Sequence, residues 1–226
     1  MTDGLLLALD TSGPYGSVAI GEGDRVIASV ELAQRREHAS RLVPTIEEAL
    51  ARASAQRRDL SGVVVGEGPG SFTGVRVAAA TAKGLVRSLG VPLWAVSSLT
   101  AAALAAEVGA IRYSLFDARG DRVYGACYGV GHARVEELLP PHGGTLRDAL
   151  AGDVPAGAVF LGDASERHRA VIEAAGYPVA RAPSDPLAVG LLRYVTLQAS
   201  LAPVSDAAGW EPAYVRASSA ERLWSL

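Results

Sequence analysis

Two short motifs contain the residues with the clearest chemical potential. In the first, Asp10-Thr11-Ser12 follows a continuous apolar run at residues 5–9. A carboxylate at the carboxyl end of a buried strand can hold a hydrated metal, and the turn after it can offer backbone N–H groups to phosphate. Asp and Ser also cap turns through side-chain hydrogen bonds, which is their more frequent role. The motif alone leaves both interpretations open.

The second motif is Gly-Pro-Gly-Ser-Phe-Thr-Gly at residues 68–74. Glycines placed before a helix allow unusual backbone angles and let a ligand or partner approach the helix N-terminus closely. The motif is not a Walker loop, because the GxxxxGK[ST] spacing is absent and Lys83 lies nine residues past Gly74. A tight strand-to-helix connection explains the same residues equally well.

Histidine, serine and cysteine give weaker signals. No i, i+4 pair and no HExxH motif for a metal occurs among His38, His132, His142 and His168. His132 and His142 flank a predicted Pro-Pro turn and are expected at the surface. Ser71 does not match the GxSxG pattern of a nucleophile. Cys127 is expected to pack in the core; as the only cysteine it can form no intrachain disulfide or cysteine-based zinc site, which fits a reducing cytoplasm.

Short apolar runs and helical periodicity alternate along the first half of the chain, and these elements must position the two motifs. The pattern predicts strands at 5–9, 17–20, 26–32, 63–66 and 92–96, and helices at 39–55, 75–89 and 97–108. Pro44 weakens the start of the first helix, since proline is tolerated only in a first turn. The order β-β-β-α-β-α-β-α implies an α/β fold with a mixed sheet covered by helices.

A similar rhythm restarts near residue 111, so the chain is predicted to form two lobes with the second abbreviated. The pattern there predicts strands at 112–117, 122–130, 134–139 and 158–162, and helices at 146–151, 165–175 and 184–201. We expect a first lobe over residues 1–108, a second, reduced lobe over 109–204, and a tail over 205–226 that packs back on the first lobe.

Composition and charge exclude several classes of protein. Of the 226 residues 49% are hydrophobic and 20% charged, a balance that argues against disorder. The net charge of −3 makes independent binding of nucleic acid unfavourable. One basic concentration, Arg35-Arg36, Arg52 and Arg57-Arg58, covers a solvated face or assists RNA held by another subunit. We expect no signal peptide, no membrane span and a cytoplasmic location.

Several segments, in order along nearly the whole chain, resemble the TsaB (YeaZ) family. The most specific is Gly-Pro-Gly-Ser-Phe-Thr-Gly-Val-Arg at residues 68–76. The others are Leu9-Asp10-Thr11-Ser12, Ser17-Val18-Ala19-Ile20, His38-Ala39-Ser40-Arg41-Leu42-Val43-Pro44, Ala80-Thr81-Ala82-Lys83-Gly84-Leu85, Val96-Ser97-Ser98-Leu99, Asp117-Ala118-Arg119 and Pro212-Ala213-Tyr214-Val215-Arg216.

The resemblance implies a two-lobed actin-like ATPase fold, of the ribonuclease H-like type, which is shared with sugar kinases and with the catalytic subunit TsaD. It also implies a non-catalytic partner or scaffold in the bacterial complex of TsaD and the ATPase TsaE. That complex transfers threonylcarbamoyl from threonylcarbamoyl-AMP to the tRNA adenosine adjacent to the anticodon. The expected partners are TsaD in a heterodimer, TsaE and tRNA through the complex, and a second copy when the chain is alone.

The resemblance also bears on catalysis. It implies no catalytic residue and no metal ligand, and it leaves open a weak ATP or ADP site with Mg²⁺ at the subunit junction. The candidates for such a residual nucleotide site are Asp10, Thr11, Ser12, Gly68, Gly70 and Asp117. Three departures from active relatives predict that the chain alone neither hydrolyses ATP nor transfers the group. Arg119 stands where small residues follow the second-lobe Asp, Leu161-Gly162-Asp163 keeps one glycine of a pair, and His38 lacks a second histidine.

An alternative function is an active nucleotide-dependent enzyme of the same superfamily, either kinase-like or a TsaD-like transferase. A metalloprotease-like activity is disfavoured by the histidine spacing. The feature that distinguishes an active nucleotide-dependent enzyme from a partner subunit is a phosphate-binding loop in the second lobe.

The predicted helices at 39–55 and 75–89 are the expected partner interface. Small side chains let helices approach closely, so these two could form half of a four-helix bundle with TsaD or with a second copy. Alternatively, alanine-rich helices simply cover the sheet. The residues expected at the interface are Leu42, Val43, Ile46, Leu50, Val75, Ala78, Ala79 and Ala82.

Overall fold

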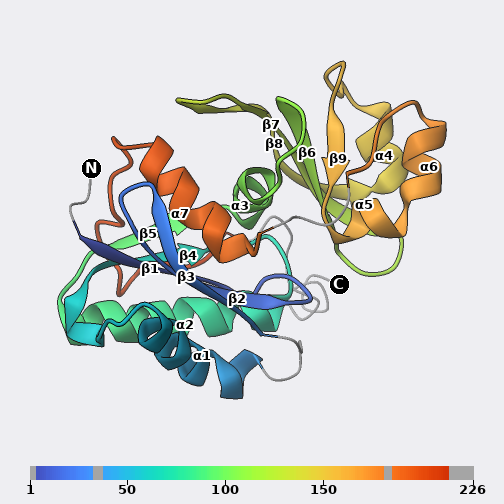
Figure 1. Ribbon diagram of the computed structural model, residues 1–226. Helices are drawn as coiled ribbons and strands as arrows, with labels where there is room; N and C mark the ends of the chain where they lie inside the picture. Colours follow the sequence, from blue (N-terminus) through green and yellow to red (C-terminus); the bar gives the residue numbers. More distant parts are fainter. Residues whose placement is uncertain (1–3, 33–37, 181–184, 214–226) are drawn as a thin grey trace.

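The computed structural model describes residues 4–32, 38–180 and 185–213. Each of two sheets forms the centre of one lobe, and the lobes lie side by side (Figure 1). Some residues discussed above lie outside the described part of the chain: Arg35, Arg36, Ser184, Tyr214, Val215, Arg216 and the rest of the tail to residue 226.

The first lobe contains a five-stranded sheet in the order β3-β2-β1-β4-β5. Strands β1 to β3 are antiparallel neighbours, whereas β4 pairs parallel with β1 and with β5. Its elements are β1 (Leu5–Asp10), β2 (Gly16–Glu22), β3 (Arg25–Leu32), α1 (His38–Arg52), η2 (Arg57–Asp59), β4 (Leu60–Gly66), α2 (Phe72–Leu89), β5 (Leu93–Val96) and α3 (Ser98–Ala105). This element order confirms the predicted mixed α/β sheet.

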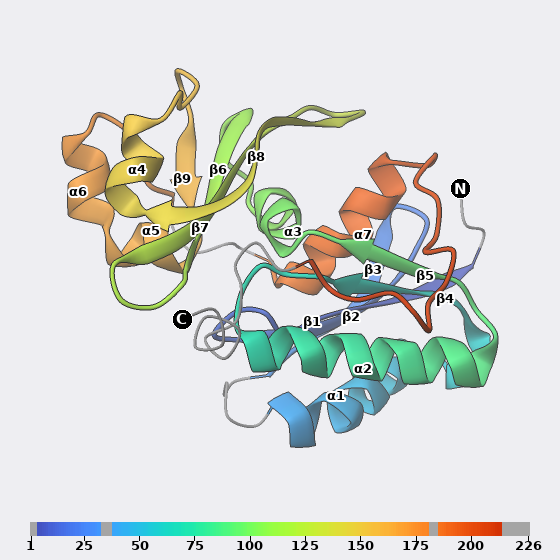
Figure 2. The ribbon, with the colours of Figure 1, turned by 180° about the vertical axis from the view of Figure 1, so that it is seen from behind.

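The second lobe contains a four-stranded sheet in the order β8-β7-β6-β9, with β9 parallel to β6. Its elements are β6 (Ile111–Asp117), β7 (Arg122–Val130), β8 (Val135–Thr145), α4 (Leu146–Ala151), β9 (Val159–Leu161), α5 (Asp163–Arg167) and α6 (Arg169–Ala174). Helices α4, α5 and α6 cover the outer side of this sheet, and α3 covers the side that faces the first lobe (Figures 1 and 2).

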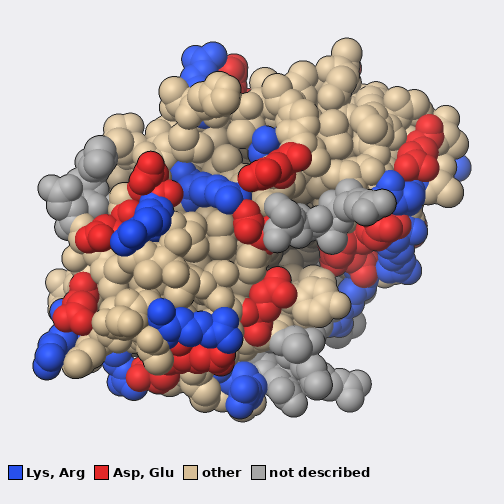
Figure 3. All heavy atoms as spheres, in the orientation of Figure 1, with Lys and Arg blue, Asp and Glu red and all other residues tan. Residues whose placement is uncertain are grey.

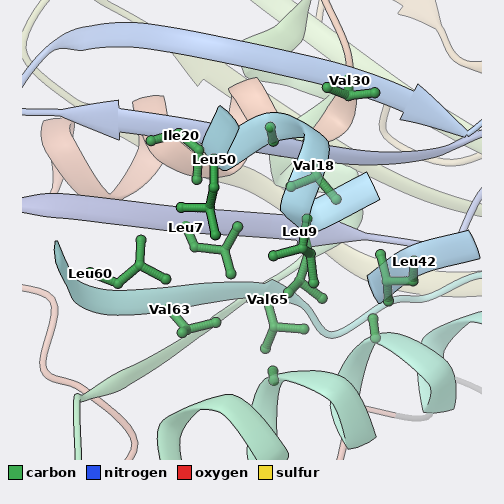
Figure 4. Packing of buried hydrophobic residues seen from close by; sticks show 14 of the residues in the cluster. Leu7, Leu9, Val18, Ile20, Val30, Leu42, Leu50, Leu60, Val63 and Val65 are labelled. Carbon is green, nitrogen blue, oxygen red and sulfur yellow. The ribbon is translucent and has the colours of Figure 1, made fainter. Parts of the chain in front are cut away.

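Alternate residues of the central strands β1 and β4 face opposite sides of the first sheet, as the period of two in a strand requires. Leu7 and Leu9 point to the side covered by α1 and α2, together with Val63 of β4 (Figure 4). Leu6 and Val64 point to the opposite side. Because both faces are covered by helices, these strands are continuous apolar runs in the sequence.

Helix α7 (Leu187–Leu197) covers that opposite side, against β1, β2 and β4. The sequence assigns this segment to the second lobe, and that expectation is wrong for α7, which packs on the first sheet. Residues 201–213 then follow the first lobe: Leu93 O accepts from Val204 N at 2.8 Å, and Lys83 Nζ donates to Ala208 O at 2.9 Å.

Several element boundaries differ from the sequence prediction. Helix α2 begins at Phe72 instead of residue 75, because Ser71 caps it by accepting from Gly74 N. The predicted helix at 165–175 is two helices, α5 and α6, separated at His168. Helices α3 and α7 end earlier than predicted. Strand β8 continues through Pro140-Pro141, which a sheet edge tolerates because one side of an edge strand needs no donors.

Within the described part of the chain, none of the helices is long and apolar enough to cross a membrane.

Candidate functional site

Asp10 stands at the carboxyl end of β1 and is completely buried. Its Oδ1 accepts hydrogen bonds from Ser12 N at 2.8 Å and from Ser12 Oγ at 2.7 Å. Its Oδ2 accepts from Ser98 Oγ at 2.6 Å, from the start of α3. Every one of these partners belongs to the chain itself. The carboxylate therefore caps its own turn and ties it to α3, which is the structural interpretation of the motif.

The glycine-rich segment between β4 and α2 closes over the same turn. Ser71 N donates to Ser12 O at 2.8 Å, and Thr11 Oγ1 donates to Gly74 O at 2.6 Å. A Cβ at Gly74 would lie 1.9 Å from Thr11 O, and one at Gly70 would lie 2.5 Å from Ser12 O. The glycines are thus required for close packing of backbone on backbone.

Ser98 joins the two motifs, a role that the sequence did not reveal. Its Oγ donates to Asp10 and accepts from Gly68 N at 3.1 Å. The signal available in the sequence was only a serine after a short strand, which predicts a helix cap and not a link between Asp10 and the glycine segment.

The second-lobe loop after β6 is also internally paired. Asp117 Oδ1 accepts from Arg119 N at 2.9 Å, and Arg167 lies 3.1 Å from Asp117 Oδ2. Asp163 Oδ1 in turn accepts from Asp117 N at 3.1 Å. Arg119 has φ of 69° and Gly120 has φ of 70°, so a bulky residue occupies a left-handed conformation that favours glycine. The loop is therefore held by hydrogen bonds and an ion pair among its own residues and Arg167.

The structure brings five of the six nucleotide-site candidates into one hydrogen-bonded and packed cluster: Asp10, Thr11, Ser12, Gly68 and Gly70. Asp117 belongs to a separate network in the second lobe. Among the residues that the structure describes, no three His, Cys, Asp or Glu side chains come together as a metal site.

The predicted interface residues are mostly inside the chain's own core, which corrects that part of the prediction. Val43 is 50% exposed. The other seven, all residues of α1 or α2, are at most 5% exposed: Leu42, Ile46, Leu50, Val75, Ala78, Ala79 and Ala82. The physical reason is that the sheet's apolar face must be covered, and small side chains on α2 let it approach that face closely.

The opposite face of α2 is exposed and was missed. Phe72 is 41% exposed, and the Arg76 guanidinium lies 3.9 Å from the centre of its ring. Ala80 and Gly84 continue the same face at a spacing of four residues, and both are exposed. We call Phe72, Arg76, Ala80 and Gly84 the outer stripe of α2. Its signal in the sequence was the recurrence of these residues at a spacing of four, on the side of the helix away from the buried residues.

His142 differs from its predicted place at the surface. It lies half-buried in β8, and its Nε2 is 2.9 Å from the hydroxyl of Tyr113. Its Nδ1 lies 3.0 Å from Pro140 O. Cys127 is buried in β7, as predicted, and burial raises the pKa of its thiol to about 11. Such a thiol is inert at neutral pH.

The described arginines of the basic concentration have acidic partners at the surface. Arg52 pairs with Glu48 at 2.6 Å, and Arg57 pairs with Glu47 at 2.6 Å. Acidic and basic side chains alternate over the face shown in Figure 3, without a basic patch. These pairs favour a solvated face over a contact with RNA phosphates.

Comparisons with known proteins place the chain beside tRNA-modification proteins. The family model of TsaD, tRNA N6-adenosine threonylcarbamoyltransferase, matches residues 25–206. The chain is 32% identical to the tRNA threonylcarbamoyladenosine biosynthesis protein TsaB of Bacillus subtilis over 228 residues, with 97% of each chain covered.

Solved structures agree with that relationship. YeaZ from Pseudomonas aeruginosa is similar with a TM-score of 0.78 and 28% identity, over 93% of this chain and 99% of that one. Component A of the (R)-2-hydroxyglutaryl-CoA dehydratase from Acidaminococcus fermentans has a TM-score of 0.54 at 10% identity, over 87% of this chain and 99% of that one. The latter likeness concerns the fold alone.

Proposed function

The chain belongs to the TsaB (YeaZ) family of tRNA threonylcarbamoyladenosine biosynthesis proteins and has a two-lobed actin-like fold, and from this premise we propose that it is a non-catalytic partner subunit. Its proposed partner is TsaD, with TsaE and tRNA joining through the complex of the two. Its contribution to the transfer of threonylcarbamoyl to tRNA is then a rigid surface for the catalytic subunit.

The observation that carries this proposal is the internal hydrogen bonding of Asp10. A buried carboxylate whose two oxygens already accept three hydrogen bonds has little capacity to coordinate a hydrated Mg²⁺. The glycine segment gives its donors to the chain, as with Ser71 N and Ser12 O. The residues present therefore do not fit a nucleotide within the isolated chain. Any ATP or ADP with Mg²⁺ is proposed to bind only at the junction with TsaD.

The surface proposed for TsaD is the outer stripe of α2, with Val43 of the neighbouring α1. Aromatic and arginine side chains are enriched at protein interfaces, and Phe72 and Arg76 supply one of each. Ala80 and Gly84 let a partner helix approach closely. When the chain is alone, the same surface is proposed to pair with a second copy.

The first experiment tests catalysis. The purified chain is titrated calorimetrically with ATP and Mg²⁺, and tRNA modification is assayed with and without TsaD and TsaE. We expect no heat of binding and no modified tRNA from the chain alone, with modification restored in the full mixture. Tight ATP binding or modification by the chain alone would instead support the active-enzyme alternative.

The second experiment tests the surface. Ala80→Asp places a charge on the exposed stripe, and Ala170→Asp places the same charge on exposed α6 as a control. We expect Ala80→Asp to weaken TsaD binding at least about tenfold, which corresponds to about 1.4 kcal/mol, with unchanged thermal stability. Equal TsaD affinities for both variants would refute this interface. A charge at Ala78 or Ala82 is uninformative, because both are fully buried and the fold itself would suffer.

A further inference from the structure

Helix α3 lies between the two lobes (Figures 1 and 2). All eight of its residues are buried. Leu99, Ala102 and Ala103 pack with Phe116 and Tyr128 of the second sheet. Ala101 packs on the first-lobe side. One short helix is therefore part of two hydrophobic cores, which explains why it is apolar around its whole circumference.

The second lobe forms hydrogen bonds with both ends of α3. Ser114 Oγ of β6 donates to Leu99 O at 2.7 Å, in a buried position. At the other end, Arg112 Nη1 donates to Ala103 O at 2.6 Å. Arg112 Nε also contacts Gly109 O at 2.9 Å, in the segment that leads from α3 into β6. The carbonyl oxygens at the end of α3 thus receive charged donors from the second lobe, which their partial negative charge favours.

Helix α7 of the first lobe packs closely against α3 and forms a hydrogen bond with it. A Cβ at Gly190 would lie 2.0 Å from Ala101 O, so the two helices touch backbone to backbone. Arg193 Nη1 donates to Leu104 O at 2.9 Å, and Arg193 Nη2 lies 2.7 Å from Asp185. Burial and the nearby charge of Arg193 lower the pKa of Arg112. Arginines from the two lobes therefore converge on consecutive carbonyls of α3.

We propose that α3, with Arg112, Ser114 and Arg193, is a clamp that holds the two lobes as one rigid body. Rotation of one lobe on the other would separate α3 from one of its two cores and break buried hydrogen bonds. The clamp does not depend on the proposed partner function, because it concerns the chain by itself. It predicts that neither ATP with Mg²⁺ nor any other ligand closes the lobes.

The test measures an interlobe distance in the full chain. Ser88→Cys in α2 and Ala170→Cys in α6 provide exposed sites for spin labels, whereas Cys127 is buried and stays unlabelled. Pulsed electron resonance is expected to give one narrow distance distribution that ATP and Mg²⁺ leave unchanged. A broad or two-peaked distribution, or a shift on adding ATP and Mg²⁺, would overturn the clamp.

Variants test whether the clamp residues keep the distribution of interlobe distances narrow. Arg112→Ala should at least double the width of the distribution, and Arg112→Lys should give an intermediate width, since an ammonium group reaches fewer of the carbonyls. Arg147→Ala, at an exposed arginine of α4, is the control and should change nothing. An unchanged width in Arg112→Ala would overturn the proposal. If Arg112→Ala does not fold, Ser114→Ala is measured in the same way, with the same criterion.

A measurement on the unsubstituted chain is independent of these variants. The clamp predicts that the amides of α3 exchange with deuterated solvent only when the whole chain unfolds, as slowly as those of β1 and β4. Exchange of the α3 amides at least tenfold faster than those of the central strands would show that the lobes separate locally, and would refute the clamp.

Discussion

Replacing Gly74 with alanine tests the closure of the glycine segment over the Asp10 turn. The new Cβ would lie 1.9 Å from Thr11 O, and both atoms are fixed by backbone. A normal carbon–oxygen contact needs about 3.3 Å, so the start of α2 must move by about 1.4 Å. That movement breaks the bond from Thr11 Oγ1 to Gly74 O and the bond from Ser71 N to Ser12 O.

The expected loss of stability combines three contributions. Each broken hydrogen bond costs about 1 kcal/mol, and overpacking of a close contact costs about 1–3 kcal/mol. The better helix propensity of alanine returns about 1 kcal/mol. Gly74→Ala should therefore lower the free energy of unfolding by about 2–4 kcal/mol, which for a chain of this size lowers Tm by roughly 5–15 °C.

The assay is urea and thermal unfolding of the isolated chain, with Gly84→Ala as the matched control. Gly84 stands in the same helix, is exposed, and has no atom within 4 Å of an added Cβ. Its replacement should raise stability by about 0.5–1 kcal/mol through propensity alone. If Gly74→Ala also stabilises the chain, the segment is not closed over residues 11 and 12, and the argument against a nucleotide site fails.

Three further substitutions concern polar side chains that are buried or half-buried. Tyr113→Phe loses a hydroxyl that contacts His142 and should destabilise the chain by about 1 kcal/mol in urea unfolding. Tyr128→Phe should be neutral or stabilising, because the Tyr128 hydroxyl faces Thr100 and Ser97 without a well-aligned hydrogen bond; the opposite order of the two variants would contradict this. Burial raises the pKa of Glu67, so the folded state holds a proton on this side chain more tightly than the unfolded state does. The resulting stabilisation is present at low pH and is lost as pH rises through the folded-state pKa. Glu67→Gln should therefore be more stable than the original chain at about pH 7, with a gain that vanishes at about pH 4; equal gains at both values would exclude this account.

The strands and helices could be predicted from the sequence because each follows from a local apolar run or a local periodicity. Leu5–Asp10 is apolar on both faces of a covered sheet, and Arg122–Val130 begins after a turn containing Gly120. The close approach that glycine permits at residues 70 and 74 was one of the two interpretations of their motif. The structure shows this close packing through contacts that are distant in sequence, such as Thr11 with Gly74.

The position of α7 could not be predicted for the same reason. The segment follows the second lobe along the chain, but its apolar side fits the first sheet, where Ala188 N donates to Ser17 Oγ at 3.0 Å. Local periodicity shows that a helix has an apolar side and not which surface that side meets. The same limit applies to α2, where the stripe containing Ala78 and Ala82 was assigned to a partner and in fact meets the chain's own sheet.

The glycine-rich segment, the most specific resemblance to the TsaB family, has a structural role of its own. Its hydrogen bonds fix Ser71 to the end of β1, and the outer stripe of α2 begins at the very next residue, Phe72. A surface whose first anchor is already ordered loses less conformational entropy when a partner binds. Loosening this segment should therefore weaken TsaD binding even though the stripe itself is unchanged. Gly74→Ala, assayed at a temperature where it remains folded, should bind TsaD more weakly than the unsubstituted chain, and equal affinities would show that the segment serves the fold alone.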